Sequence, residues 1–164
     1  MQDQSVVTLG VADIGAVMDL ERMCFRTRWT RDQFLLGLER KAFRILGIRE
    51  RGVLIAYCAF SVIAGEMEIM NIATHPFHRR KGLGRALMAE VLRKCAAEGV
   101  AEGFLEVRRS NVGAIDLYEK FGFIQIGTRK NYYPDNMEDA LLFRLEIRGE
   151  QGADPCTPPS AKEA

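Results

Sequence analysis

Apolar residues recur along this chain with two different periods, and the period changes from one segment to the next. Residues 43–49, 53–63 and 66–74 are rich in β-branched and aromatic side chains, which is typical of strands. The breaks at 51–52 and 64–65 each contain a glycine and are short enough for hairpins. The pattern therefore predicts three consecutive antiparallel strands.

A helical period follows these strands. Leu83, Leu87 and Val91 are spaced by four residues and predict one face of a long helix over residues 83–98. Gly99 comes directly after this segment, where glycine commonly ends a helix.

The remaining predicted elements are shorter. Asp13 can cap a helix with apolar residues at 14, 17 and 18. Thr30 and Gln33 fit the capping box of a second helix. The same patterns predict strands at 5–9, 104–108, 124–132 and 140–147, and a helix at 111–121.

The order of these elements predicts an α/β (mixed α+β) fold. The strand–helix–strand passages at both ends of the long helix imply locally parallel pairing, whereas the hairpins require antiparallel pairing. We therefore expect a central mixed, mostly antiparallel sheet with helices on both faces. Residues 1–148 are predicted to form one domain. Residues 149–164 contain three of the five prolines and no aromatic residue, which predicts a disordered tail.

Composition and charge exclude several classes of protein. Hydrophobic residues make up 48% of the chain, as in an ordinary globular domain, and the formal net charge is only +1. Such a balance gives no global field that would hold nucleic acid or an anionic membrane. The longest uncharged run, residues 53–65, is too short to cross a membrane. The four cysteines are scattered, so we expect free thiols and a cytoplasmic protein.

A basic, glycine-containing loop precedes the long helix. Its residues are Arg79, Arg80, Lys81, Gly82, Leu83, Gly84 and Arg85. Glycines let the backbone approach a ligand, and the free N–H groups of a helix's first turn favour an anion. The loop therefore predicts a pyrophosphate site, although it matches neither a Walker A loop nor a Rossmann fingerprint. His75 and His78 do not predict a metal site, because the chain has no other histidine and no cysteine lies near them.

A second cluster of candidate residues lies between 105 and 123. Glu106 is near the end of a predicted strand, where the ligands of α/β sheets tend to bind. Asn111 and Tyr118 are seven residues apart and share one face of the predicted helix. On the pattern alone, Tyr118 would be a core residue with a satisfied hydroxyl and Glu106 a surface carboxylate.

The loop resembles a family signature. Arg79-x-x-Gly82-x-Gly84 matches the Gln/Arg-x-x-Gly-x-Gly/Ala motif of the Gcn5-related N-acetyltransferases, where this turn binds the pyrophosphate of acetyl-CoA. The resemblance implies the acyl-CoA N-acyltransferase fold, with acetyl-CoA as co-substrate. The cofactor contacts that we expect are the loop residues 79–85, Asn111 and the backbone of Ile72, Ala73 and Thr74.

The second cluster points to one branch of that family. The string LEVR-x-SN-x-x-A-I-x-LYEKFGF, with NYYP at 131–134, closely resembles the ribosomal-protein-alanine N-acetyltransferases. The resemblance covers about residues 6–145. It implies that the partner is the N-terminus of a ribosomal protein, and that Tyr132 or Tyr133 lines the mouth where this substrate enters.

The same resemblance implies roles for two side chains. Glu106 would be the general base and Tyr118 the general acid. These roles agree with the chemistry, because an ammonium must lose a proton before it can attack a thioester, and a departing thiolate benefits from a proton donor. The backbone N–H groups of residues 72–74 would polarise the thioester carbonyl. We expect neither a metal nor a covalent acyl-enzyme, and Cys95 falls at a core position of the long helix.

Two other functions stay open at this point. A small-molecule amine or lysine acetyltransferase would use the same machinery, and Asp135, Glu138 and Asp139 could attract a polycation. A non-catalytic acyl-CoA-binding module would need the loop but would not need both Glu106 and Tyr118. The sequence does not indicate an oligomeric state.

Overall fold

The computed structural model describes residues 4–149, and their elements follow the order predicted from the sequence. The strands are β1 (Val6–Leu9), β2 (Arg44–Glu50), β3 (Val53–Ile63), β4 (Glu66–Thr74), β5 (Glu102–Arg108), β6 (Ile124–Tyr133) and β7 (Glu138–Glu146). The helices are α1 (Ile14–Cys24), α2 (Arg31–Glu39), α3 (Leu83–Ala97) and α4 (Val112–Lys120), with 3-10 turns at Val11–Asp13 and Pro76–His78.

The described strands form one sheet in the order β1-β2-β3-β4-β5-β7-β6. Neighbouring strands are antiparallel, except for β4 and β5, which are parallel and joined by α3. This confirms the mixed, mostly antiparallel sheet. The locally parallel pairing expected at the long helix is confirmed by β4 and β5. Beyond α4, β7 folds back from β6 and takes the place between β5 and β6.

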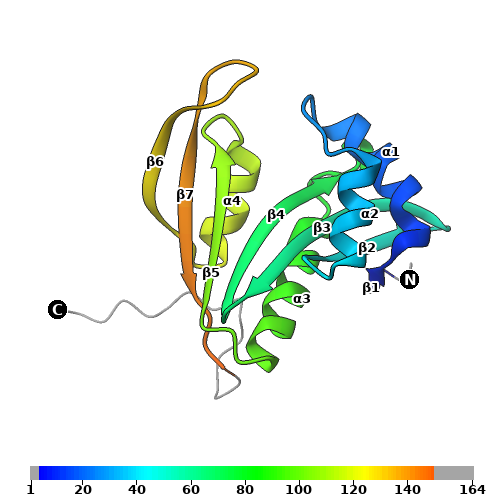
Figure 1. Cartoon of the computed structure of the whole chain (residues 1–164), viewed down its shortest axis with the longest axis horizontal. Helices are drawn as coiled ribbons and strands as arrows, with labels where there is room; N and C mark the ends of the chain where they lie inside the picture. Colours follow the sequence, from blue (N-terminus) through cyan, green and yellow to red (C-terminus); the bar gives the residue numbers. More distant parts are fainter. Residues whose placement is uncertain (1–3, 150–164) are drawn as a thin grey trace.

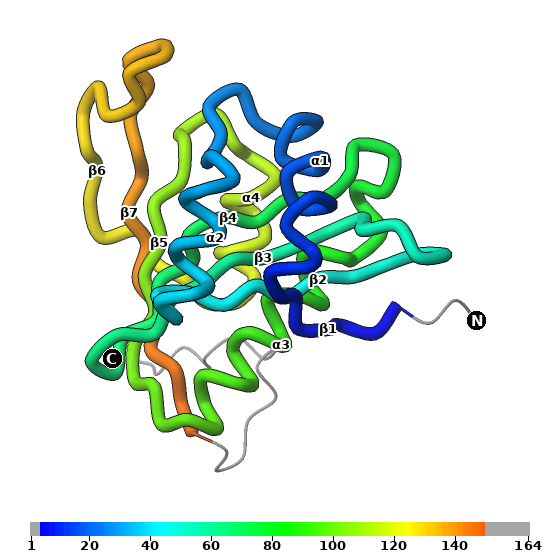
Figure 2. Tube along the Cα trace, turned by 45° about the vertical axis from the view of Figure 1, so that its right-hand side comes forward, coloured from blue at the N-terminus to red at the C-terminus, as the bar shows by residue number. Residues whose placement is uncertain are grey.

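Helices cover both faces of the sheet, as predicted. Helices α1 and α2 pack on the face of β2–β4 that carries Tyr57 and Ala59. Helices α3 and α4 pack on the opposite face, against Met67 and Leu105. Figure 2 shows α1 and α2 in front of β2–β4. The part of this face that belongs to β5, β7 and β6 lies beside these two helices rather than beneath them (Figure 1).

Strands β4 and β5 pair over only part of their length. Their parallel register ends at the pair formed by Ile69 and Leu105. The register of β4 against β3 shifts between Ala59 and Phe60, which leaves Met70 as an extra residue in β4. Such a β-bulge bends the strand and increases its twist. Figure 1 shows that β4 and β5 lie together at one end and diverge towards the other.

Two predicted helix caps have different outcomes. The capping box of α2 is confirmed, because Thr30 Oγ1 accepts from Gln33 N at 3.2 Å and Gln33 Oε1 accepts from Thr30 N at 2.8 Å. Asp13 precedes α1, but its side chain does not cap that helix. It instead accepts from Gly10 N at 2.8 Å and pairs with Arg49 at 2.6 Å, because a 3-10 turn comes before the helix.

The predicted tail lies outside the described residues, except for Gly149. Across residues 4–149, no helix has both the length and the apolar character that a membrane span requires.

Candidate active site

The basic loop between β4 and α3 has the backbone geometry that its glycines predict. Gly82 precedes the first turn of α3 with φ +81°, and Arg80 is also left-handed at φ +63°. The carbonyl of Gly82 accepts the first helical hydrogen bond, from Ala86 N at 3.0 Å. The N–H groups of this first turn have no acceptor within the helix, so they can point at an anion. A Cβ atom at Gly82 would meet nothing within 4 Å, which leaves room for a ligand.

Two contacts hold this loop against its neighbours. A Cβ atom on Gly84 would lie 3.1 Å from Leu117 Cδ2, so a larger residue would require Leu117 to shift by a few tenths of an ångström. Arg79 Nε donates to the carbonyl of Thr74 at 3.2 Å and thereby ties the loop to the end of β4. Arg79 therefore has a structural contact besides any contact with a cofactor.

The predicted backbone donors on β4 do not all face the same way. His75 N donates to Ile55 O at 2.8 Å, and antiparallel ladders alternate between bonded and non-bonded pairs. This alternation turns the backbone of Ala73 towards β3. It turns the backbone groups of Ile72 and Thr74 towards the side where β5 has diverged. The N–H groups of Ile72 and Thr74 are thus better candidates than that of Ala73 to donate a hydrogen bond to the thioester carbonyl.

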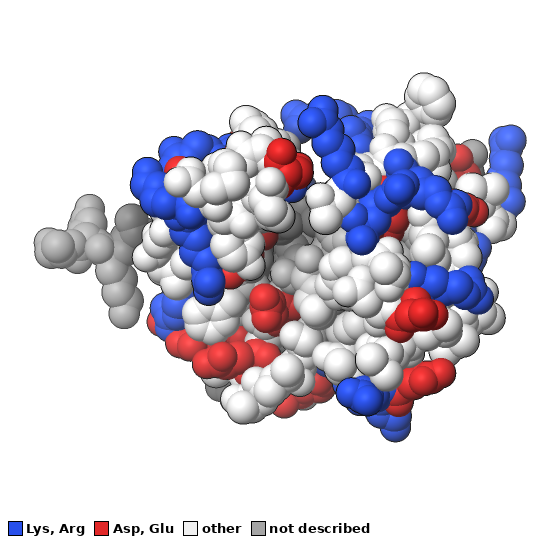
Figure 3. Space-filling model, turned by 45° about the horizontal axis from the view of Figure 1, so that its top comes forward, with Lys and Arg blue, Asp and Glu red and all other residues white. Residues whose placement is uncertain are grey.

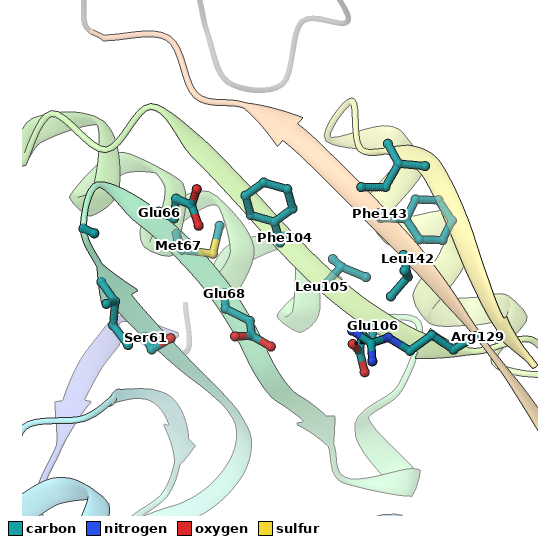
Figure 4. Close-up of a pocket in the computed structure, with 13 residues that line it drawn as sticks. Ser61, Glu66, Met67, Glu68, Phe104, Leu105, Glu106, Arg129, Leu142 and Phe143 are labelled. Carbon is teal, nitrogen blue, oxygen red and sulfur yellow. Dashed lines mark ion pairs between the residues drawn. The ribbon is translucent and has the colours of Figure 1, made fainter. Parts of the chain in front are cut away.

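Glu106 lies on β5, just beyond the last residue that pairs with β4. Its side chain is partly exposed and borders an open cavity of about 470 Å³. Arg129 Nε on β6 lies 3.2 Å from its Oε1 atom. Glu68 on β4 borders the same cavity, and Figure 4 shows the Glu68 and Glu106 carboxylates on the same side of the sheet, with Arg129 reaching towards Glu106. Burial and the neighbouring Glu106 carboxylate raise the pKa of Glu68.

Tyr118 lies on α4, and only 4% of its surface is exposed. Its ring packs edge-on against Phe123, with centroids 5.8 Å apart. Burial raises the pKa of its phenol above the usual value, so the hydroxyl stays protonated at neutral pH. Tyr118 is therefore a core residue, as the pattern alone suggests.

Asn111 does not lie within the helix on the face of Tyr118 but immediately before it. Its Oδ1 atom accepts from Ala114 N at 3.3 Å and caps α4. The side-chain oxygen is thus occupied by the helix, which leaves the amide nitrogen as its donor towards a ligand.

The adjacent tyrosines 132 and 133 differ in exposure. Tyr132 is 44% exposed, and hydrogen bonding with Glu106 is the main reason that its pKa is raised. Tyr133 is half-buried, and the guanidinium of Arg108 lies 3.9 Å from its ring centroid. The two rings are 5.2 Å apart and nearly perpendicular. Tyr132 is therefore the member that lies beside Glu106.

Arg108, to which the sequence assigned no role, holds the hairpin between β6 and β7. Its guanidinium lies 3.0 Å from Asp135 Oδ1, 3.3 Å from Asn136 Oδ1 and 3.5 Å from Glu138 Oε2. Asp139 pairs with Arg109 at 3.3 Å. Because these carboxylates already have partners within the chain, the hairpin is a weaker attractor of polycations than its composition suggests.

Sequence reasoning also missed Glu68, Arg129 and Glu21. Arg129 meets Glu106 because β7 lies between β5 and β6, and Glu68 lies beside β5 because it pairs with Phe104 in the parallel register. Glu21, near the end of α1, is only 1% exposed. Its spacing of four residues from the buried Val17 was the one sequence feature that indicated its burial.

Within residues 4–149, no three or more His, Cys, Asp or Glu side chains form a group that could hold a metal ion. Cys58 and Cys95 are buried, and burial raises their thiol pKa values to about 12 and about 11, which makes them poor nucleophiles.

Figure 3 shows acidic and basic side chains interspersed around a hollow on one face, in keeping with the near-zero net charge.

Comparison with known proteins agrees with this geometry. The Acetyltransferase (GNAT) family matches residues 14–123. A [Ribosomal protein bS18]-alanine N-acetyltransferase of Escherichia coli (strain K12) is 33% identical over 145 residues, which cover 87% of this chain and 97% of that protein. A Bacillus subtilis (strain 168) protein, named as a candidate enzyme of the same kind, is 37% identical over 144 residues, covering 87% and 95%.

The fold agrees as well. The crystal structure of the ribosomal-protein-S18-alanine N-acetyltransferase from Escherichia coli superposes with a TM-score of 0.83 at 32% identity, over 92% of this chain and 99% of that one. The predicted acyl-CoA N-acyltransferase fold is thus confirmed. The chain belongs to the GNAT family of acetyltransferases and is an acetyl-transferring enzyme.

Proposed function

We propose that this enzyme transfers the acetyl group of acetyl-CoA to the N-terminal alanine of a ribosomal protein, with Glu106 as general base and Tyr118 as general acid. The observation that carries the proposal is the similarity, over 87% of the chain, to a ribosomal protein bS18-alanine N-acetyltransferase. The geometry adds that Glu106 lies just beyond the last pair of β4 and β5 and borders an open cavity along the paired part of these strands.

The co-substrate would be held by the residues of the basic loop. GNAT acetyltransferases use acetyl-CoA, whose pyrophosphate suits the first turn of α3 and the side chains of Arg80, Lys81 and Arg85. The open space beside Gly82 supports this fit. The amide nitrogen of Asn111 and the N–H groups of Ile72 and Thr74 are further donors for this ligand. None of these roles requires a metal.

Glu106 would accept the proton that the substrate ammonium must lose. Its carboxylate is accessible from the cavity, which lets the amine approach directly or through a water. Tyr118 would donate to the departing thiolate, because its raised pKa keeps the phenol protonated at neutral pH.

An α-amine suits this site better than a lysine. At pH 7, deprotonating an α-amine of pKa about 8 costs about 1.4 kcal/mol, whereas a lysine of pKa about 10.4 costs about 4.6 kcal/mol. A single carboxylate base with modest help suffices for the smaller cost. The paired carboxylates of the β6–β7 hairpin, in turn, do not favour a polyamine.

The test is a mass-spectrometric assay of acetyl transfer to three acceptors at equal concentration: a peptide that starts with alanine, the same peptide with a blocked N-terminus and a free lysine, and spermidine. The first should be acetylated at its α-amine and the other two should be nearly inert. Comparable turnover of the blocked peptide, or faster turnover of spermidine, would remove this protein from the N-terminal class.

A further inference from the structure

Arg129 lies beside Glu106, the proposed base. Its Nε atom lies 3.2 Å from Glu106 Oε1, and its guanidinium carbon is 5.5 Å from the ring centroid of Tyr132. Arg129 reaches Glu106 across β7, where Ala140 pairs with Arg129 on one side and with Arg108 on the other. The small side chain of Ala140 leaves this path open, and Figure 4 shows the ion pair at one end of the cavity.

The cavity around this pair is acidic. Glu66, Glu68 and Glu106 border it, and Arg129 is the one cationic side chain among the described residues that line it. Glu68 lies close enough to both Glu106 and Arg129 for each to influence its ionisation. The cavity therefore holds one cation, which is paired with the Glu106 carboxylate of β5, while the Glu68 carboxylate of β4 borders the same space.

This cation is held loosely. The side chain of Arg129 is 54% exposed, and β6 is the edge strand of the sheet. Exposed ion pairs are worth little, so a competing cation can replace the guanidinium at small cost. The substrate of the proposed reaction brings such a cation, because an α-amine of pKa about 8 is mostly protonated at pH 7.

We propose that Arg129 is a displaceable counter-ion, which holds the place of the substrate's α-ammonium in the free enzyme and leaves Glu106 when the substrate binds. This inference rests on the proposed function, since it takes Glu106 as the group that receives the amine. The exchange of one cation for another keeps the Glu68 and Glu106 carboxylates compensated. The exchange favours acceptors that carry a positive charge at the reacting nitrogen. A blocked N-terminus is neutral, so it cannot replace the ion pair that Glu106 loses when Arg129 leaves.

The test measures steady-state kinetics with an alanine-starting peptide for the wild type, Arg129→Gln, Arg129→Lys and Lys130→Gln. Removing the competing guanidinium in Arg129→Gln should lower the peptide KM about two- to fivefold and leave the KM for acetyl-CoA unchanged. Arg129→Lys keeps a competing cation and should stay near the wild type. Lys130→Gln is the matched control, because Lys130 is the next residue, is well exposed and pairs with Asp139 at 3.6 Å instead.

A second measurement adds a guanidinium compound to Arg129→Gln, to replace the side chain that the substitution removes. Ethylguanidinium should raise the peptide KM of Arg129→Gln, whereas the same concentration of sodium chloride should change it less. An unchanged or raised peptide KM in Arg129→Gln, with an active wild type, would overturn this inference and leave the proposed function intact. A wild type that transfers acetyl to no N-terminal peptide would overturn the proposed function and this inference together.

Discussion

Asn71 on β4 donates its side-chain Nδ2 to Oε1 of Glu21 on α1, at 2.5 Å. The hydroxyl of Tyr57 donates to the same oxygen, so the bond joins two strands of the sheet to the helix that covers them. Oε2, the other carboxylate oxygen, is buried without a partner among residues 4–149. Burial raises the pKa of Glu21 from 4.5 to about 7. Asn71 follows the bulge at Met70, so this acidic group supports the segment of β4 that diverges from β5.

The ionisation of Glu21 should make the stability of the fold depend on pH. A carboxyl whose pKa is higher in the folded than in the unfolded state favours folding when protonated. Its contribution is therefore largest below about pH 4.5 and is lost as the pH rises towards 7 and above. Glu21→Gln should remove this dependence and raise the free energy of unfolding at pH 8, relative to the wild type, by up to about 3 kcal/mol.

Urea unfolding of both proteins at pH 5 and pH 8 measures this difference. Glu119→Gln, on the exposed side of α4, is the control for the same chemical change elsewhere. Equal pH dependence in the wild type and in Glu21→Gln would show that Glu21 does not carry the titration.

Gly84→Asp should weaken acetyl-CoA binding by about 2 kcal/mol or more, a roughly thirtyfold higher Kd. The new carboxylate would stand in the first turn of α3, where a pyrophosphate is to bind, and its Cβ atom would press on Leu117. Calorimetry with acetyl-CoA measures the loss. Gly15→Asp places the same side chain at the second residue of α1, where a Cβ atom meets nothing within 4 Å, and should bind normally. Unchanged affinity in folded Gly84→Asp would refute the phosphate assignment.

Tyr118→Phe separates the packing role of this residue from its chemical role. Because phenylalanine keeps the ring that packs against Phe123, removal of the hydroxyl should leave the thermal unfolding midpoint nearly unchanged. The rate kcat should nevertheless fall by about 10²-fold, because the thiolate then departs without a proton donor. A variant with both normal stability and normal kcat would make Tyr118 a core residue only.

Tyr132→Phe should raise the peptide KM while leaving the affinity for acetyl-CoA nearly constant. Tyr132 is the exposed member of the pair, and Glu106 is near enough to raise its pKa, so the loss of its hydroxyl affects the acceptor side of the site. Tyr133→Phe, in the half-buried ring under Arg108, should change KM less. The opposite ranking of the two variants would place Tyr133 at the mouth instead.

The sequence predicted most elements because their signals are local. Strands β3 and β4 begin and end at the predicted residues, since glycine hairpins mark both breaks. The capping box of α2 and the glycine turn before α3 are also encoded within a few neighbouring residues. Helix α3 and its C-terminal glycine followed from spacing alone.

What the sequence could not predict depends on pairing between distant segments. The insertion of β7 between β5 and β6 decides that Arg129 meets Glu106, and no local pattern encodes that order of strands. The bulge at Met70 arises from the register between β3 and β4. The burial of Glu21 depends on Tyr57 and Asn71, which lie 36 and 50 residues away along the chain.

The pH–rate profile of Glu106→Gln with an alanine-starting peptide shows whether Glu106 takes the proton of the substrate amine. With Glu106 as the base, kcat of the variant at neutral pH should fall by about 10²–10⁴-fold with acetyl-CoA affinity retained. Raising the pH should partly restore it, since the amine then arrives deprotonated. Glu102→Gln, on the same strand but paired with Arg144, should keep the wild-type profile. Wild-type turnover with an unchanged pH profile in Glu106→Gln would show that Glu106 is not the general base.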